Sequence, residues 1–288
     1  MNAKIAEIVT SKIIAELEKG NCIWLKSWKN NPISHQTKKP YTGINHWILN
    51  LESMKKEYKD NLWLSYKQTI RLKGNVKKEE LKNGTAIIFF QMVEYKDKDN
   101  EEKIKRIPLL KYFRVFNIQQ CKNITVPEWF NNKENNQIME AESIYNNMQN
   151  KPELKHGGEK SAYYPTDDYI QIPDLTKFKN SNSYYATLYH EMIHATGNEK
   201  RLNRNIKNTF GDPDYAKEEL TAEMGSSILN HHAGINTEEL LKNNAGYIQS
   251  WLKALKDDRS LIIKASSQAE KAVKYILNEN QEQEKQPD

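Results

Sequence analysis

The stretch SYYATLYHEMIHATG, residues 183–197, decides the fold of the second half of this chain. It contains the pattern H-E-x-x-H as His190, Glu191 and His194. Residues four apart on a helix lie on one face about one turn apart, so both imidazoles can bind a single ion. Gly197 marks the end of the predicted helix. An apolar stripe indicates that this helix is buried, and it consists of Tyr185, Leu188, Met192 and Ala195.

The third metal ligand is expected from the segment DYAKEELTAEMGSSILNHH, residues 214–232. A catalytic zinc ion takes three protein ligands and leaves one position open. Glu219 and Glu223 share one helical face, and we predict Glu219 as the ligand. Glu223 is then expected to accept a hydrogen bond from a ligand histidine. Glu218 lies about 100° away around the helix, so we expect it to face solvent.

This constellation predicts hydrolysis of a peptide bond. Zinc lowers the pKa of water towards about 7, and Glu191 would take the proton as the water attacks a carbonyl carbon. The strand-like arm YIQIP, residues 169–173, is a candidate for aligning a peptide by edge pairing. Two plainer interpretations stay open, namely surface histidines on an amphipathic helix and a solvated glutamate face.

Charge is distributed unevenly along the 288 residues. Residues 1–130 hold 24 Lys+Arg and 14 Asp+Glu, whereas the remainder holds 19 and 24. Five of the six tryptophans also lie in the basic part. A basic, aromatic-rich half joined to a mildly acidic half predicts two domains with different partners.

The pattern of apolar residues and turn signals predicts an α+β protein, with a small N-terminal α+β domain followed by a mainly helical domain. The asparagine-rich stretch at 130–137 separates a domain at 1–130 from a domain at 138–278, and the tail 279–288 is expected to be disordered. Strands are expected at 85–95 and 109–121 around a solvated loop at 96–103, and the arms of AYYPTDDYIQIP, 162–173, are expected to flank a turn. Helices are expected at 3–19, 46–57, 138–149, 183–196, 213–231, 238–256 and 258–278.

Composition excludes some classes of protein. No run approaches the roughly 18 apolar residues of a membrane span, so no membrane partner is expected. The first 20 residues form an amphipathic pattern with acidic residues and lack the features of a signal peptide. Cys22 and Cys121 do not make a disulfide framework or a metal-binding pair. A cytoplasmic protein is therefore expected.

The basic half is suited to single-stranded DNA, which is bound by positive grooves and by aromatic rings on which bases stack. Tryptophans also anchor the cores of small domains, and lysines mostly coat surfaces, so a purely structural role is the alternative for each aromatic residue. The candidate DNA-binding residues are Trp24, Lys26, Trp28, Lys29, Lys38, Lys39, Tyr41, Asn45, Trp47, Trp63, Lys67, Lys77 and Lys78.

Across nearly its whole length the chain resembles the ArdC-type antirestriction proteins of conjugative plasmids. In the second half the resemblance rests on AYYPTDDYIQIP (162–173), YHEMIHATGNEKRLNR (189–204), FGDPDYAKEELTAEMG (210–225) and NNAGYIQSWLKALKDD (243–258). In the first half it rests on WLKSW (24–28), NPISHQTKKPYTGINHWIL (31–49), WLSYKQ (63–68) and KYFRVFNIQQC (111–121). One departure is Ser27, where the family usually has proline.

The resemblance implies an N-terminal single-stranded-DNA-binding domain and a zincin-like metallopeptidase domain. It also implies Zn²⁺, or another divalent transition metal, held by His190, His194 and a glutamate, with Glu191 as the base. Likeness to the acidic helix of other zincins favours Glu219 as that glutamate. The function implied is protection of incoming single-stranded DNA from restriction during conjugation.

Two alternatives to that function stay open. In one, the protein is a metalloprotease directed at DNA-bound proteins, and the basic domain is a targeting module. In the other, zinc only supports the fold, although a structural site has no need of a base such as Glu191.

Overall fold

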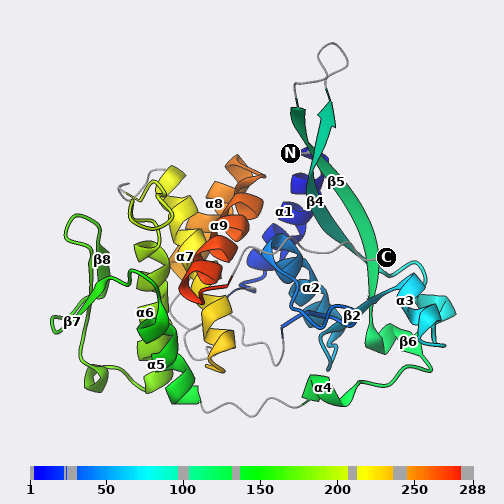
Figure 1. Cartoon of the computed structure of the whole chain (residues 1–288), viewed down its shortest axis with the longest axis horizontal. Helices are drawn as coiled ribbons and strands as arrows, with labels where there is room; N and C mark the ends of the chain where they lie inside the picture. Colours follow the sequence, from blue (N-terminus) through cyan, green and yellow to red (C-terminus); the bar gives the residue numbers. More distant parts are fainter. Residues whose placement is uncertain are drawn as a thin grey trace.

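The computed structural model describes residues 3–22, 24, 31–96, 104–131, 137–206, 213–235 and 245–279. Helices and strands are mixed along the chain, which confirms the predicted α+β class (Figure 1). The helices are α1 (Ala3–Leu17), α2 (Gly43–Lys56), α3 (Tyr66–Arg71), α4 (Glu128–Asn131), α5 (Gln137–Asn147), α6 (Ser181–Ala195), α7 (Pro213–His232), α8 (Ala245–Asp257) and α9 (Leu261–Ile276). The strands are β1 (Ile33–Ser34), β2 (Leu62–Ser65), β3 (Asn75–Val76), β4 (Thr85–Lys96), β5 (Ile104–Asn117), β6 (Cys121–Lys122), β7 (Glu153–His156), β8 (Ala162–Tyr164) and β9 (Tyr169–Ile172).

The first half is built on a four-stranded sheet in the order β1-β2-β5-β4. Strands β4 and β5 pair in antiparallel register from Thr85 opposite Val115 to Lys96 opposite Ile104, and this long hairpin stands out from the body (Figure 1). The two predicted strands are therefore confirmed, although β5 begins earlier than expected. Of the predicted solvated loop, residues 97–103 lie outside the described part of the chain.

A three-stranded sheet in the order β7-β9-β8 precedes the H-E-x-x-H helix. Strands β8 and β9 form the hairpin expected from AYYPTDDYIQIP, and Asp168 in its turn has a left-handed φ of 54°. Strand β7 was not predicted. Its residues are mostly exposed, and its parallel partner β9 follows in the chain only after β8.

The helices predicted for the second half are present, with ends shifted by a few residues. Helix α8 is described only from Ala245, because residues 236–244 lie outside the described part. The same holds for residues 280–288, so the predicted disorder of the tail stays a prediction. Helix α9 packs against α7 and also against α2 of the first half.

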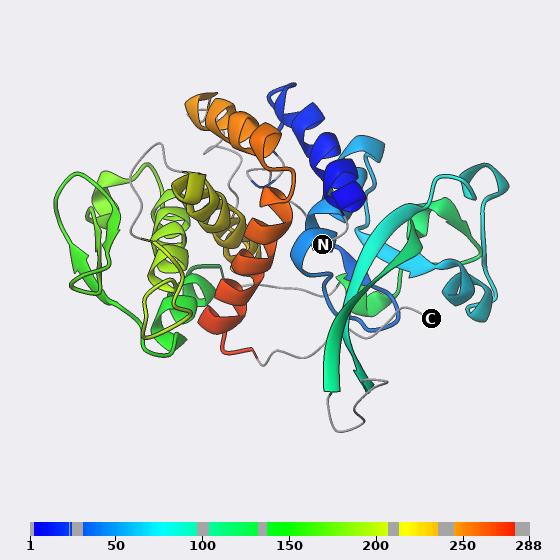
Figure 2. The same cartoon turned by 90° about the horizontal axis from the view of Figure 1, so that it is seen from above.

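One apolar core joins the two halves. It includes residues from α1 and α2 together with residues from α5 to α9. Within it Trp24 meets Trp47 and Trp251 edge to face, with ring centroids 6.5 and 5.3 Å apart. Figure 2 shows α1 and α2 between the four-stranded sheet and the helices of the second half. The halves thus share packing, and their division at 130–137 into separate folding units stays a prediction.

Cys22 and Cys121 are both buried and form no disulfide with each other. Within the described ranges, no helix combines the length and the apolar character needed to cross a bilayer.

Candidate metal centre

Helix α6 carries His190, Glu191 and His194. It begins after Asn180, whose side-chain oxygen accepts a hydrogen bond from the backbone N–H of Ser183 at 2.9 Å. Such an N-cap satisfies one of the free N–H groups at a helix start. The predicted stripe of Tyr185, Leu188, Met192 and Ala195 is buried, which fixes the rotation of the helix. The two histidines consequently face α7.

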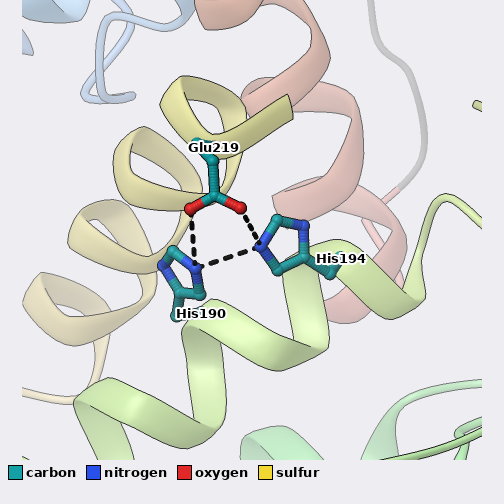
Figure 3. A group of neighbouring side chains, drawn as sticks. All are labelled: His190, His194 and Glu219. Atoms are coloured by element: carbon teal, nitrogen blue, oxygen red, sulfur yellow. Dashed lines mark hydrogen bonds and ion pairs between the residues drawn. The ribbon is translucent and has the colours of Figure 1, made fainter. Parts of the chain in front are cut away.

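Three donor groups converge between α6 and α7 (Figure 3). Nε2 of His190 lies 3.0 Å from Nε2 of His194. One carboxylate oxygen of Glu219 lies 3.7 Å from Nε2 of His190, and the other lies 3.5 Å from Nε2 of His194. Among the described residues this is the cluster whose ligand atoms all fall within 4.8 Å of one another. The predicted set of ligands is therefore brought together.

These separations fit a divalent ion. Bonds of about 2.0–2.1 Å in a tetrahedral arrangement place neighbouring ligand atoms about 3.3–3.4 Å apart. The observed 3.0 to 3.7 Å brackets that value. Two imidazoles and one carboxylate also form the donor set of known catalytic zinc sites and leave a coordination position open.

Each histidine has a carboxylate near Nδ1, the ring nitrogen that does not face the other two ligands. Nδ1 of His194 donates a hydrogen bond to Oε1 of Glu218 at 3.2 Å, and Nδ1 of His190 lies 3.8 Å from Oε1 of Glu223. Glu223 is predicted to accept a hydrogen bond from a ligand histidine, but its 3.8 Å separation from His190 is an ion-pair distance and longer than a hydrogen bond. The prediction that Glu218 faces solvent is wrong: Glu218 is buried, because α7 packs closely on α6 and the chain after α6 covers that side.

Electrostatics at this site favour a neutral His190. Burial, and then the neighbouring His194, holds the pKa of His190 well below its usual range. Burial raises the pKa of the Glu223 carboxyl to about 7, and the nearby charge of Glu219 acts in the same direction. A divalent cation would compensate the negative charge that these carboxylates bring together.

Glu191 is not among the converging ligands. Its carboxylate instead accepts a hydrogen bond from the backbone N–H of Tyr163 in β8 at 2.8 Å. Burial raises the pKa of Glu191, while His194 and the Tyr163 N–H oppose that rise. A carboxylate beside a site that could hold an ion, held by a strand and poorly hydrated, is suited to taking a proton.

Strand β8 is itself held by a partly buried polar cluster. The Tyr163 hydroxyl donates to Asp168 at 2.8 Å and accepts from Asn198 at 2.8 Å. Arg201 pairs with Asp168 and donates to the Ala195 carbonyl at 2.6 Å. The turn of the β8–β9 hairpin is thereby tied to the end of α6.

The strand predicted to align a peptide was YIQIP, which contains β9. Strand β9 lies in the middle of its sheet, with β7 on one side and β8 on the other, so its backbone groups are already paired. That prediction is corrected: β8 is the edge strand beside Glu191.

Several candidate DNA-binding residues prove to be buried. The side chains of Trp24, Trp47 and Trp63 are at most 1% exposed, so their rings pack in the core and present no face to a base. Asn45 bonds the backbone N–H and C=O of Ile88 and so occupies the outer edge of β4. These four predictions are corrected, because the side chains of Trp24 after α1, of Asn45 and Trp47 in α2, and of Trp63 in β2 all lie in the protein interior.

The remaining candidates differ in accessibility. Lys77 is partly buried and donates to the Gln119 carbonyl at 2.8 Å, and Tyr41 is partly buried against the core. Lys26, Trp28 and Lys29 lie outside the described residues. The exposed candidates are Lys38, Lys39, Lys67 and Lys78.

Sequence reasoning missed two exposed aromatics of the first half. Tyr66, at the start of α3, is 45% exposed, and Tyr112, on β5, is 49% exposed. The alternation along KYFRVF could have indicated Tyr112, since Phe113 and Val115 point to the opposite face. No local signal marks Tyr66.

Family models match both halves of the chain. Residues 139–268 match the zincin-like metallopeptidase model, and residues 3–116 match the model of the N-terminal domain of anti-restriction factor ArdC. The second half therefore has a zincin-like metallopeptidase fold. The metal-free crystal structure of the antirestriction ArdC protein from the R388 plasmid superposes with a TM-score of 0.78 at 32% identity, covering 97% of this chain and 98% of that one. The chain belongs to the ArdC family of antirestriction proteins.

Other relatives span the same region. The Mn(II)-bound structure of the R388 ArdC protein gives a TM-score of 0.78 at 33% identity, covering 95% of this chain and 97% of that one. Protein y4eC of Sinorhizobium fredii is 30% identical over 285 residues, 94% of this chain and 91% of its own length. DNA primase TraC of Escherichia coli is 31% identical over 302 residues, which is 96% of this chain but only 27% of the primase.

Proposed function

We propose that this protein binds single-stranded DNA through its first half and shields it from restriction. We propose further that its second half binds Zn²⁺ for metallopeptidase-type hydrolysis. The observation that carries the second part is the convergence of His190, His194 and Glu219 at 3.0 to 3.7 Å. Membership of an antirestriction family supports the first part.

The bound ion would polarise a substrate carbonyl and lower the pKa of water at the open position. His190, His194 and Glu219 would hold it, and the Mn(II)-bound relative supports a divalent cation in this family. Glu191 would take the proton from the attacking water and later deliver it to the leaving amine. The backbone N–H of Tyr163 orients Glu191 for that transfer.

The proposed DNA surface lies around α3 and the turn at 35–39. The side chain of Gln68 in α3 donates to that of Gln36 in the turn, so the two segments are neighbours. Lys38, Lys39 and Lys67 are exposed there, and Tyr66 offers an accessible ring beside them. Lysines neutralise phosphates and an exposed ring can stack on a base, so this arrangement suits a flexible single strand.

Titration of labelled oligo-dT into the full chain tests the DNA part. We expect binding at low salt that weakens steeply at higher salt, because neutralised phosphates release counterions. A protein that does not bind at low salt contradicts this part of the proposal.

A Glu191→Gln protein distinguishes DNA shielding from directed proteolysis. The variant keeps the shape of the side chain and removes the base. If shielding is the function, the variant still protects transferred DNA from restriction in recipient cells. Loss of protection with intact oligo-dT binding would instead favour a metalloprotease that acts on DNA-bound proteins.

A further inference from the structure

The chain that follows α6 folds back onto the end of that helix. The backbone N–H of Arg204 donates to the Gly197 carbonyl at 2.9 Å, and that of Leu202 donates to the Thr196 carbonyl at 2.9 Å. A methyl group on Gly197 would overlap the side chain of Ile206, so this close return requires glycine. The return brings Arg204 beside the last turn of α6.

Arg204 joins α6 to α7. Its side chain is only 7% exposed. Two of its nitrogens clamp the carboxylate of Glu218, with Nε at 3.0 Å and Nη2 at 2.7 Å. It also donates to the Ile193 carbonyl at 2.8 Å and to the Thr196 hydroxyl at 2.7 Å. A two-pronged arginine–carboxylate contact of this kind fixes both position and orientation.

Glu218, held in place by Arg204, in turn bonds the predicted metal ligand His194. Its Oε1 accepts from Arg204 and also from Nδ1 of His194, at 3.2 Å. An ionised carboxylate can only accept, so Nδ1 carries the proton and Nε2 is left as the ligand atom. Hydrogen bonding of the outer nitrogen is what fixes ring orientation and tautomer in metal-binding histidines.

We propose that Arg204 is a positioning residue of the metal centre, acting on His194 through Glu218. This inference rests on the proposed metal function and adds a residue that touches neither the ion site nor a ligand directly. Without Arg204, Glu218 would lose its clamp and could turn away from His194. The ion would then have to order the ring on binding, at a cost in affinity.

Arg201 provides a matched control within the same segment. Its side chain is fully buried and pairs with Asp168, and it donates to the Asn150 carbonyl at 2.7 Å. Among the described residues its side chain bonds Ala195, Asn150, Asp168 and Tyr163, and these bonds include neither Glu218 nor any of the three ligands. Replacing Arg201 therefore removes a buried, ion-paired arginine like Arg204. The contacts from Arg204 to Glu218 and from Glu218 to His194 remain.

The experiment is a titration of Zn²⁺ alone into metal-free full-length protein, with a competing chelator dye to measure the dissociation constant. We expect Arg204→Gln and Glu218→Gln each to weaken affinity about 10–100-fold. The double variant should lose little more than the worse single one, because both act through one path. Arg201→Gln should lower the melting temperature but keep the affinity within about threefold of the parent, a shift too small to reflect a lost ligand contact. Co²⁺ absorption spectra should change for Arg204→Gln and Glu218→Gln only.

Parent-like affinity in both Arg204→Gln and Glu218→Gln would overturn the proposal. Equal weakening by Arg201→Gln would also overturn it, since general loosening would then explain the loss. If Arg204→Gln does not fold, Glu218→Gln decides, because it preserves the shape of the side chain. If the parent protein binds no Zn²⁺ or Co²⁺, the proposed function itself fails, which is a different result from parent-like affinity in the variants.

Discussion

Nε2 of His190 lies 3.0 Å from Nε2 of His194, and the carboxylate of Glu219 faces both. With the proton of His194 placed on Nδ1 by Glu218, its Nε2 presents a lone pair towards His190. Two such nitrogens facing each other repel unless a proton or a cation lies between them. A divalent cation bound by both nitrogens and by Glu219 would meet this requirement.

Metal binding should accordingly stabilise the fold. At a free Zn²⁺ concentration 100 times the dissociation constant, we expect about 2.7 kcal/mol of added stability and a clear rise in melting temperature. A Glu219→Ala variant should lose most of this rise, because it removes one of three ligands. Differential scanning fluorimetry with and without a chelator measures both, and equal rises in the two proteins would contradict the assignment of Glu219.

Removal of the base should separate binding from turnover. Glu191→Gln should bind Zn²⁺ with near-parent affinity, since Glu191 contacts Tyr163 and is not a converging ligand. Hydrolysis of fluorescently labelled casein, if the parent protein supports it, should fall about 10²–10⁴-fold, the usual contribution of a positioned base. A variant that cleaves casein at the parent rate would exclude Glu191 from the mechanism.

Acid should destabilise the protein through His46. Burial lowers the pKa of His46 to about 3, with the neighbouring His231 acting in the same direction. In the unfolded chain its pKa returns to about 6.5, so between pH 6.5 and 3 the unfolded state takes up a proton that the folded state does not. The folded state therefore loses about 1.4 kcal/mol per pH unit as the pH falls through that window.

The matched control is His46→Gln, whose amide oxygen can still accept from Asn50, the partner of His46 at 3.0 Å. Urea unfolding at pH 6 and pH 5 should show a steeper loss of stability in the parent than in the variant. Parallel losses would show that His46 does not titrate on unfolding.

Two buried tryptophans should differ in what they contribute to stability. The Trp63 indole N–H donates to Asn61 at 2.7 Å, whereas the Trp47 indole N–H has no hydrogen-bond partner within the described residues. Both side chains are fully buried, so replacement by phenylalanine leaves a similar cavity at each. Trp63→Phe should cost about 1 kcal/mol more than Trp47→Phe, because it alone breaks a hydrogen bond. Equal costs by chemical denaturation would contradict this.

Charge reversal at the turn should reduce the salt dependence of DNA binding. If Lys38 and Lys39 each neutralise one phosphate, Lys38→Glu with Lys39→Glu should lower the magnitude of the log–log slope by at least about 1.4. The control reverses Lys253 and Lys271, which are exposed in the second half and give the same change in net charge. If the control lowers the slope as much, binding follows total charge and not this surface.

The local part of the metal centre could be predicted from sequence. Helical periodicity places His190 and His194 on one face of their helix, and the next predicted helix carries Glu219. The role of Glu218 could not, since it depends on how closely α7 packs on α6 and on the return of the chain at Arg204. That return is a tertiary contact without a local signature.

The burial of the tryptophans could not be predicted from sequence. Trp24 follows α1 in a stretch with little regular structure, which favoured an exposed position. It is buried because α1, α2 and α8 close around it, and Trp251 from the far end of the chain packs on its ring. Core membership of this kind is set by contacts between residues more than 200 positions apart, which no local pattern of residues encodes.

Anomalous diffraction at the zinc edge, from crystals grown with one equivalent of Zn²⁺, tests the metal centre most directly. We predict one peak within about 2.0–2.2 Å of Nε2 of His190, Nε2 of His194 and a carboxylate oxygen of Glu219. A structure in which the peak lies elsewhere, or in which Glu219 turns to solvent while the two imidazoles diverge, would contradict the assignment of these three residues as metal ligands.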